Sequence, residues 1–214
     1  MKDYARGSEW RKWDLHIHTA SSYDAYKGDD SDKLLAKAVC ENELAAIAIT
    51  DHFIIDKDRI TNIRGLLPST TIFPGVELRT DKGDTNIHVI LIFSDQIDLN
   101  TLSEDFNVFK RDAKNPDNND KIYWDYNDIC AFAQKHNALI SIHAGSKDKG
   151  VDTQISNALP INQAVKEEFA KTVSIFEVGK EKDIDDYKKY VFPDIKSTKP
   201  LIICSDSHDP RNYH

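Results

Sequence analysis

The sequence predicts an α/β protein of 214 residues in which seven strands form a closed or nearly closed barrel surrounded by helices. Seven apolar segments alternate with helix-like segments, and this order favours a largely parallel sheet. Most of the apolar segments are continuous runs of Ile, Val and Leu, which is typical of strands covered on both faces. Seven strands in about 200 residues fit one barrel better than two domains. An open, doubly wound sheet is the alternative.

The strands and helices follow each other at short intervals along the chain. Ser31 can cap a helix that runs to about Glu43 and places Leu34, Leu35, Ala38 and Val39 on one face. Pro160 is suited to the first turn of another helix. The predicted strands are Trp13–His18, Leu44–Thr50, Thr71–Leu78, Ile87–Phe93, Ala138–His143, Val173–Val178 and Leu201–Ser205. The remaining helices are predicted at Leu99–Ala113, Asp125–Asn137 and Pro160–Lys171, and the long loops at Lys114–Lys121 and Gly145–Asn157.

Composition excludes several classes of protein. No apolar run approaches the ~20 residues that a membrane span needs, and the N-terminus has no apolar core of a secretory signal. Three scattered cysteines favour reduced thiols over a disulfide framework. We therefore expect a single cytoplasmic domain over residues 1–214 with no membrane partner. The net charge of −8 does not decide the substrate, because bound cations would reverse the local sign.

Six of the eight histidines fall at the ends of predicted strands. His16 and His18 form an HxH at the end of the first strand. The others are His52, His88, His143 and His208, and carboxylates stand at equivalent places in Asp51, Glu77, Glu177 and Asp206. An isolated HxH is more often incidental than metal-binding, and a single strand-end histidine is usually a core or turn residue. The combination is difficult to explain by structural need alone.

Residues that end different parallel strands converge at one edge of a sheet. A ring of neutral imidazoles and carboxylates suits Zn²⁺, Mn²⁺ or Fe²⁺, and a bridging carboxylate is the usual way to hold two such ions together. The sequence therefore predicts a centre of two or three divalent cations.

The series DLHIHT, ITDH, GVE, two further histidines and SDSH resembles the polymerase and histidinol phosphatase (PHP) family of metal-dependent phosphoesterases. The resemblance extends from about Trp13 to Asp209. It implies a distorted (β/α)7 barrel of the TIM-like kind and a trinuclear metal centre. It also implies second-sphere roles for Asp51 and Glu177, which would orient imidazole N–H groups.

Residue by residue, the resemblance implies nine metal ligands. One metal would take His16, His18, Glu77 and Asp206; Glu77 would bridge to a second metal with His88 and His143; a third would take Asp24, His52 and His208. Asp24 departs from members that have His at this position. The residues expected to take part in catalysis are His16, His18, Asp206 and His208.

The expected reaction is hydrolysis of a phosphate ester, in which the cations acidify a water molecule and bind phosphoryl oxygens. Three alternatives stay open: a nuclease, a small-molecule phosphomonoesterase of the histidinol-phosphatase type, and an inactive structural PHP module. The segment GSEWRKWDLHIHT resembles PHP domains that precede SMC- or AAA-like ATPase modules, which implies an ATPase partner and tilts the expectation towards nucleic acid. No GxxxxGK[ST] loop is present in the chain. Basic residues in the predicted post-strand loops are either phosphate contacts or solvated surface charges; these are Lys147, Lys149, Lys180 and Arg211.

Overall fold

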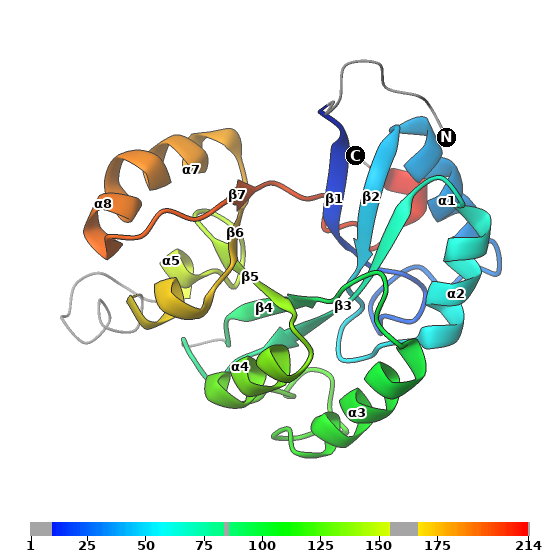
Figure 1. Cartoon of the computed structure of the whole chain (residues 1–214), viewed down its shortest axis with the longest axis horizontal. Coiled ribbons are helices and arrows are strands. Elements are labelled where there is room, and N and C mark those ends of the chain that lie inside the picture. The colour runs from blue at the N-terminus through cyan, green and yellow to red at the C-terminus, as the bar shows by residue number, and fades with distance from the viewer. Residues whose placement is uncertain (1–9, 84–85, 155–166, 214) are drawn as a thin grey trace.

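A computed structural model describes residues 10–83, 86–154 and 167–213. Seven strands form one curled sheet in the order β1-β2-β3-β4-β5-β6-β7, and the helices lie around its outside (Figure 1). The strands are β1 (Lys12–Ile17), β2 (Leu44–Ile49), β3 (Thr71–Arg79), β4 (His88–Ile92), β5 (Leu139–Ala144), β6 (Ile175–Val178) and β7 (Leu201–Ile202). All seven predicted strands are present, and the α/β class is confirmed.

Strand β4 runs against the direction of the other six. It pairs antiparallel with both β3 and β5, whereas every other neighbouring pair is parallel. A short connection, without a crossover helix, joins β3 to β4 and permits this arrangement. The N-terminal end of β4, where His88 stands, therefore meets the C-terminal ends of the other strands.

The sheet is open between β1 and β7 in the described residues. Only an isolated parallel bridge, Ile17 to Ser207, joins the two edges, so a fully closed barrel is not shown. The strand predicted at Leu201–Ser205 ends earlier, at Ile202. The Asp14 carboxylate accepts a hydrogen bond from the Ser205 N–H at 3.2 Å, and this occupies an amide that a strand ladder would use. After β7 the chain crosses to β1 (Figure 1).

Most of the predicted helices are present with slightly shorter bounds. They are α1 (Ser31–Glu41), α3 (Leu99–Arg111) and α4 (Tyr126–Lys135). The helix predicted from Pro160 begins outside the described residues, but residues 167–172 are helical. Helix α2 (Lys57–Leu66) was not predicted; Asp56 caps it by accepting the Arg59 N–H at 3.0 Å. The segment predicted as the loop Gly145–Asn157 contains the short α5 (Val151–Gln154), while its last three residues lie outside the described part.

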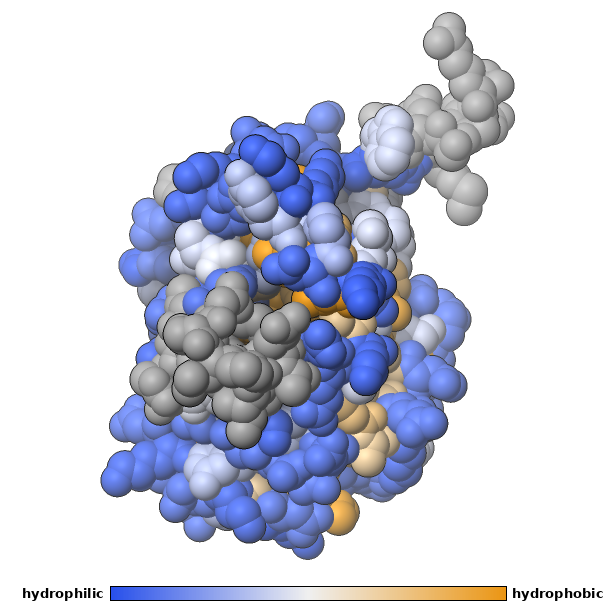
Figure 2. Space-filling model, turned by 90° about the vertical axis from the view of Figure 1, so that its left-hand side faces the viewer, coloured by the Kyte–Doolittle hydropathy of each residue, from blue (hydrophilic) through white to orange (hydrophobic). Residues whose placement is uncertain are grey.

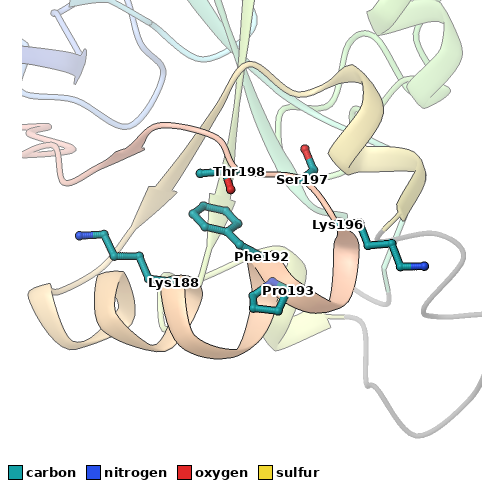
Figure 3. Close-up of a pocket in the computed structure, with 6 residues that line it drawn as sticks. All are labelled: Lys188, Phe192, Pro193, Lys196, Ser197 and Thr198. Carbon is teal, nitrogen blue, oxygen red and sulfur yellow. The ribbon is translucent and has the colours of Figure 1, made fainter.

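The last third of the chain covers β6 and β7 with α7 (Glu181–Asp186), a π-helical turn at Tyr187–Val191 and α8 (Phe192–Ile195). This side of the molecule is largely hydrophilic, with hydrophobic residues visible in a narrow central zone (Figure 2). A hollow of about 370 Å³ lies beside Phe192 and Pro193, and the ammonium groups of Lys188 and Lys196 point away from it (Figure 3). None of the nine predicted ligands lines this hollow.

Two apolar layers support the sheet. The main core packs the outward side chains of the strands, such as Ile47 and Val76, against helix residues such as Leu35 and Phe106. A smaller cluster of Ala48, Ile90 and Ile92, with Leu15 and Phe73 against it, is separate from this core. Ile90 is the direct partner of Glu77 across the β3–β4 pair, so this cluster adjoins the predicted ligands. No helix in the described part of the chain is both long and apolar enough to cross a membrane.

Candidate metal centre

Two histidines and two carboxylates converge where β1 ends. The Nε2 atoms of His16 and His18 lie 3.0 Å apart. Both face Glu77 Oε2, at 2.9 and 3.1 Å, and both face Asp206 Oδ1, at 3.3 and 3.4 Å. His16, His18 and Glu77 are buried, and Asp206 is one-third exposed. These four donors lie close enough together to share one metal ion.

The second oxygen of Glu77 faces a different pair of histidines. His88 Nδ1 lies 2.5 Å from Glu77 Oε1, and His143 Nε2 lies 3.7 Å from the same oxygen. Because β4 is antiparallel, His88 reaches this place from the start of its strand. One carboxylate therefore lies between two groups of imidazoles, as a bridging ligand would.

A third group lies nearer to solvent. Asp24 Oδ2 lies 3.3 Å from His52 Nε2 and 3.3 Å from His208 Nε2. His18 stacks on both rings, with centroid distances of 4.7 Å to His52 and 3.9 Å to His208. The structure thus brings all nine predicted ligands together, and metal ligation itself stays a prediction.

The outward nitrogen of three histidines is held by an acceptor. The Nδ1–H groups of His143 and His208 donate to the carbonyl oxygens of Asp148 and Asp206, at 3.0 and 2.9 Å. His16 Nδ1 lies 3.0 Å from both carboxylate oxygens of Glu177. Each of these contacts leaves Nε2 facing the centre, which is how proteins orient imidazole ligands.

The first and last motifs of the chain are joined through the backbone. Asp206 N donates to His16 O at 3.0 Å, and His18 N donates to Ser207 O at 3.0 Å. Asp206 has a φ of +51°, a left-handed conformation that Asp tolerates better than most residues. This backbone bend places the Asp206 carboxylate beside His16 and His18. The pairing holds the two most distant parts of the site together.

Glu177 and Asp51 were both expected to orient imidazoles, and only Glu177 does so. The Asp51 carboxylate accepts hydrogen bonds from Thr19 N at 2.5 Å and Thr19 Oγ1 at 2.6 Å instead. The expectation for Asp51 is therefore wrong. Its carboxylate fixes the turn after the HxH motif, because it accepts hydrogen bonds from Thr19, the residue that follows His18.

Sequence reasoning missed Asp14. One of its oxygens accepts the backbone N–H groups of His16 and Ser205, both at 3.2 Å, and the other accepts the Tyr213 hydroxyl. The available signal was a carboxylate within a predicted strand, between Trp13 and Leu15 and two positions before the HxH motif.

Mutual contacts change the pKa values of these groups. Burial alone would raise the pKa of Glu77, but the surrounding imidazoles, His16 first, hold it well below the usual range. Burial lowers the pKa of His18, yet hydrogen bonds to Asp206 and Glu77 outweigh this and raise it to about 9. His143 behaves differently, because burial dominates and lowers its pKa to about 4. At Asp24, as at Glu77, burial alone would raise the pKa, but hydrogen bonds to His208 and His52 outweigh it and hold the pKa below its usual range.

Of the four basic residues singled out in the sequence, Lys147 lies at the centre. Its Nζ pairs with Glu177 and lies 3.3 Å from Asp206 Oδ2. Arg211 is instead exposed, pairs with Asp209 and lies over the Tyr26 ring at 4.0 Å. Lys180 is exposed as well.

Comparisons with known proteins give a fold and no family. No family model matches the chain, and no curated protein matches it. A Bifidobacterium adolescentis structure, described by inference as a metal-dependent phosphoesterase, is similar with a TM-score of 0.61 and 11% identity, over 92% of this chain and 87% of that one. A Chromobacterium violaceum amidohydrolase with bound sulfate and no metal is similar with a TM-score of 0.60 and 12% identity, over 92% of this chain and 88% of that one. PsfC from Pseudomonas syringae is similar with a TM-score of 0.52 and 17% identity, over 92% of this chain and 75% of that one. At these identities the likeness shows the fold alone.

The residues present fit divalent metal ions. Among the described residues, four buried imidazole nitrogens have no hydrogen-bond partner: three belong to predicted ligands, namely Nδ1 of His18, Nδ1 of His52 and Nε2 of His143, and the fourth is Nε2 of His136, outside the site. Of these, Nε2 of His143 is the atom that would bind a metal here. Leaving a buried polar atom unpaired is costly. An imidazole-rich set with carboxylates matches the preferences of Zn²⁺, Mn²⁺ and Fe²⁺ better than those of Ca²⁺ or Mg²⁺.

Proposed function

We propose that this chain is a metal-dependent hydrolase of phosphate esters of the PHP kind, with a trinuclear centre in a distorted (β/α)7 barrel. The observation that carries the proposal is the position of Glu77. Its two oxygens face separate groups of histidines. Oε2 lies 2.9, 3.1 and 3.6 Å from His16, His18 and His52, and Oε1 lies 2.5 and 3.7 Å from His88 and His143. A carboxylate shared in this way is suited to two cations held side by side.

Each group of residues has a distinct task in this proposal. His16, His18 and His143 would bind metal through Nε2. Glu177 holds the outer nitrogen of His16, and the Asp148 carbonyl holds that of His143. Divalent cations at this place would lower the pKa of a water molecule and offset the negative charge that builds up on a phosphoryl group. Asp24, Asp206 and His208 lie at the accessible edge, where a substrate would meet the centre.

We propose DNA or RNA as the substrate, in cooperation with an ATPase module. The support is the resemblance of the opening segment to PHP domains that precede such modules. The sulfate in the Chromobacterium structure is a tetrahedral oxyanion like a phosphate group, which is compatible with a phosphate ester here.

The test is product analysis with Mn²⁺-loaded protein. End-labelled single- and double-stranded DNA and RNA are incubated with the wild type and with His16→Ala, and p-nitrophenyl phosphate is assayed in parallel. Cleavage of nucleic acid that is lost in the variant supports a nuclease, and the product ladder separates end from internal attack. Hydrolysis of p-nitrophenyl phosphate alone would replace the nuclease by a small-molecule phosphomonoesterase. Activity that survives in His16→Ala would contradict the proposed centre.

A further inference from the structure

Lys147 places a nearly buried ammonium group at the edge of the centre. Its side chain is 11% exposed. Its Nζ pairs with Glu177 Oε1 and lies 3.3 Å from Asp206 Oδ2. The first carboxylate is fully buried and the second is one-third exposed, so the lysine reaches from the interior to the accessible edge.

The two oxygens of Asp206 have different neighbours. Oδ1 faces His16 Nε2 at 3.3 Å and His18 Nε2 at 3.4 Å, whereas Oδ2 faces Lys147. A cation shared with these imidazoles would therefore use Oδ1, and Lys147 would retain Oδ2. On the other side, Glu177 Oε1, which pairs with Lys147, also lies 3.0 Å from His16 Nδ1. One ammonium thus contacts both a predicted ligand and the group that orients another.

The loop that carries Lys147 is fixed to α7. The N–H and hydroxyl of Ser146 both donate to Asp183 Oδ2, at 3.0 and 2.6 Å. Gly145 adopts a φ of +60°, and a Cβ there would lie 2.8 Å from Asp183, so the close approach of loop and helix requires glycine. These contacts set the backbone direction immediately before Lys147.

We propose that Lys147 is a positioning residue for the metal centre: it holds Asp206 by one oxygen so that the other points at the HxH pair, and it holds Glu177 behind His16. This inference rests on the proposed function, because it assumes that the four donors bind a metal. Groups behind the direct ligands typically account for 10–100-fold in metal affinity. Lys147 is assigned that share here.

The test measures metal affinity rather than activity. Mn²⁺ and Zn²⁺ are titrated calorimetrically into metal-free wild type, Lys147→Met, Lys147→Arg and the same-loop control Lys149→Met. We expect the dissociation constant of one site to rise about 10–100-fold in Lys147→Met, to recover most of that loss in Lys147→Arg, and to stay unchanged in Lys149→Met. Unchanged affinity in Lys147→Met would overturn the inference. Tighter binding would overturn it too, since Lys147 would then compete with the metal.

A second variant covers a folding failure of Lys147→Met. Asp183→Asn weakens the attachment of the loop without touching the centre, and it should lower affinity for the same site by a smaller factor. Unaltered affinity there, together with an unfolded Lys147→Met, would count against a positioning role and leave Lys147 a folding residue. If the wild type itself binds no metal, the proposed function and the inference both fail. If the wild type binds metal and the variants match it, only the inference fails.

Discussion

The centre has a buried half and an accessible half that are built differently. His16, His18, Glu77 and His143 are at most 3% exposed and stand on β1, β3 and β5 or directly after them. The side chains of Asp24, Asp206 and His208 are 32–34% exposed and lie in loops. Backbone hydrogen bonds within the sheet hold the strands that carry the buried residues. Glu177 and the Asp148 carbonyl hold the outer nitrogens of His16 and His143.

This difference assigns metal binding to the buried half and substrate contact to the accessible half. A strand backbone bonded on both sides fixes the direction of its side chains, so the buried half is formed before any ion binds. Loop residues are more easily rearranged and are the usual place for substrate contacts. Substitutions in the two halves should therefore have different signatures.

The largest effect is expected at Glu77. Glu77→Gln removes the charge that faces five imidazoles and leaves at most one oxygen acceptor for the two sides, so hydrolysis should fall by at least about 10²–10³-fold. Metal content should fall by two ions per chain. Elemental analysis and initial rates on the same preparations check this result. A variant that keeps its full metal content would show that Glu77 does not bridge.

Metal removal should destabilise the whole protein. An ion present at about 100 times its dissociation constant contributes about 2.7 kcal/mol by mass action. In a chain of this size that corresponds to a fall in Tm of roughly 5–10 °C on chelation. Calorimetric scans with and without chelator measure it, and readdition of Mn²⁺ serves as the control. An unchanged Tm would contradict preferential binding of the ion to the folded protein.

Asp24→Ala should affect the accessible half alone. Asp24 contacts His52 and His208 and none of the other predicted ligands at these distances. Metal content should therefore fall by about one ion per chain, with the Tm of the loaded protein reduced by less than in Glu77→Gln. Three ions retained in Asp24→Ala would contradict a third site at this place.

The smallest predicted effect is a dependence on pH within the buried half. The pKa of His18 in the metal-free protein is raised from 6.5 to about 9, because hydrogen bonds to Asp206 and Glu77 outweigh burial. Its contribution to stability is thus complete below pH 6.5 and is lost as the pH rises through about 9. Metal binding requires the neutral ring, so affinity should increase over the same interval. Denaturation and metal titration between pH 6.5 and 9 should show opposite slopes. Parallel slopes would contradict a protonated His18.

The strand positions and the convergence of the strand-end histidines were open to sequence reasoning for one physical reason, whereas the full set of nine ligands was implied by the resemblance to the PHP family. Continuous apolar runs mark buried strands, and parallel strands bring their ends together wherever they lie in the chain. His16, Glu77 and His143 could be placed in one site on that basis. His88 could not be explained in this way, since no local pattern reports that β4 is antiparallel.

What sequence reasoning missed depends on the folding of loops. The contact of Lys147 with Asp206 joins two loops far apart in the chain, and no spacing rule predicts it. The expected role of Asp51 was wrong because its carboxylate accepts hydrogen bonds from Thr19 instead of from an imidazole. Helix α2 had a detectable signal in its Asp56 cap and in Ile60 and Ile63, but its polar composition obscured the pattern.

The measurement that tests the central claim most directly is anomalous diffraction from crystals grown with Mn²⁺ or Zn²⁺. A centre of two or three metal ions should give two or three anomalous peaks. The expected places are among His16, His18, Glu77 and Asp206, among Glu77, His88 and His143, and beside Asp24, His52 and His208. The Glu77 carboxylate should lie between the first two. A crystal grown with metal that shows no peak within bonding distance of Glu77 would contradict a metal centre bridged by this residue.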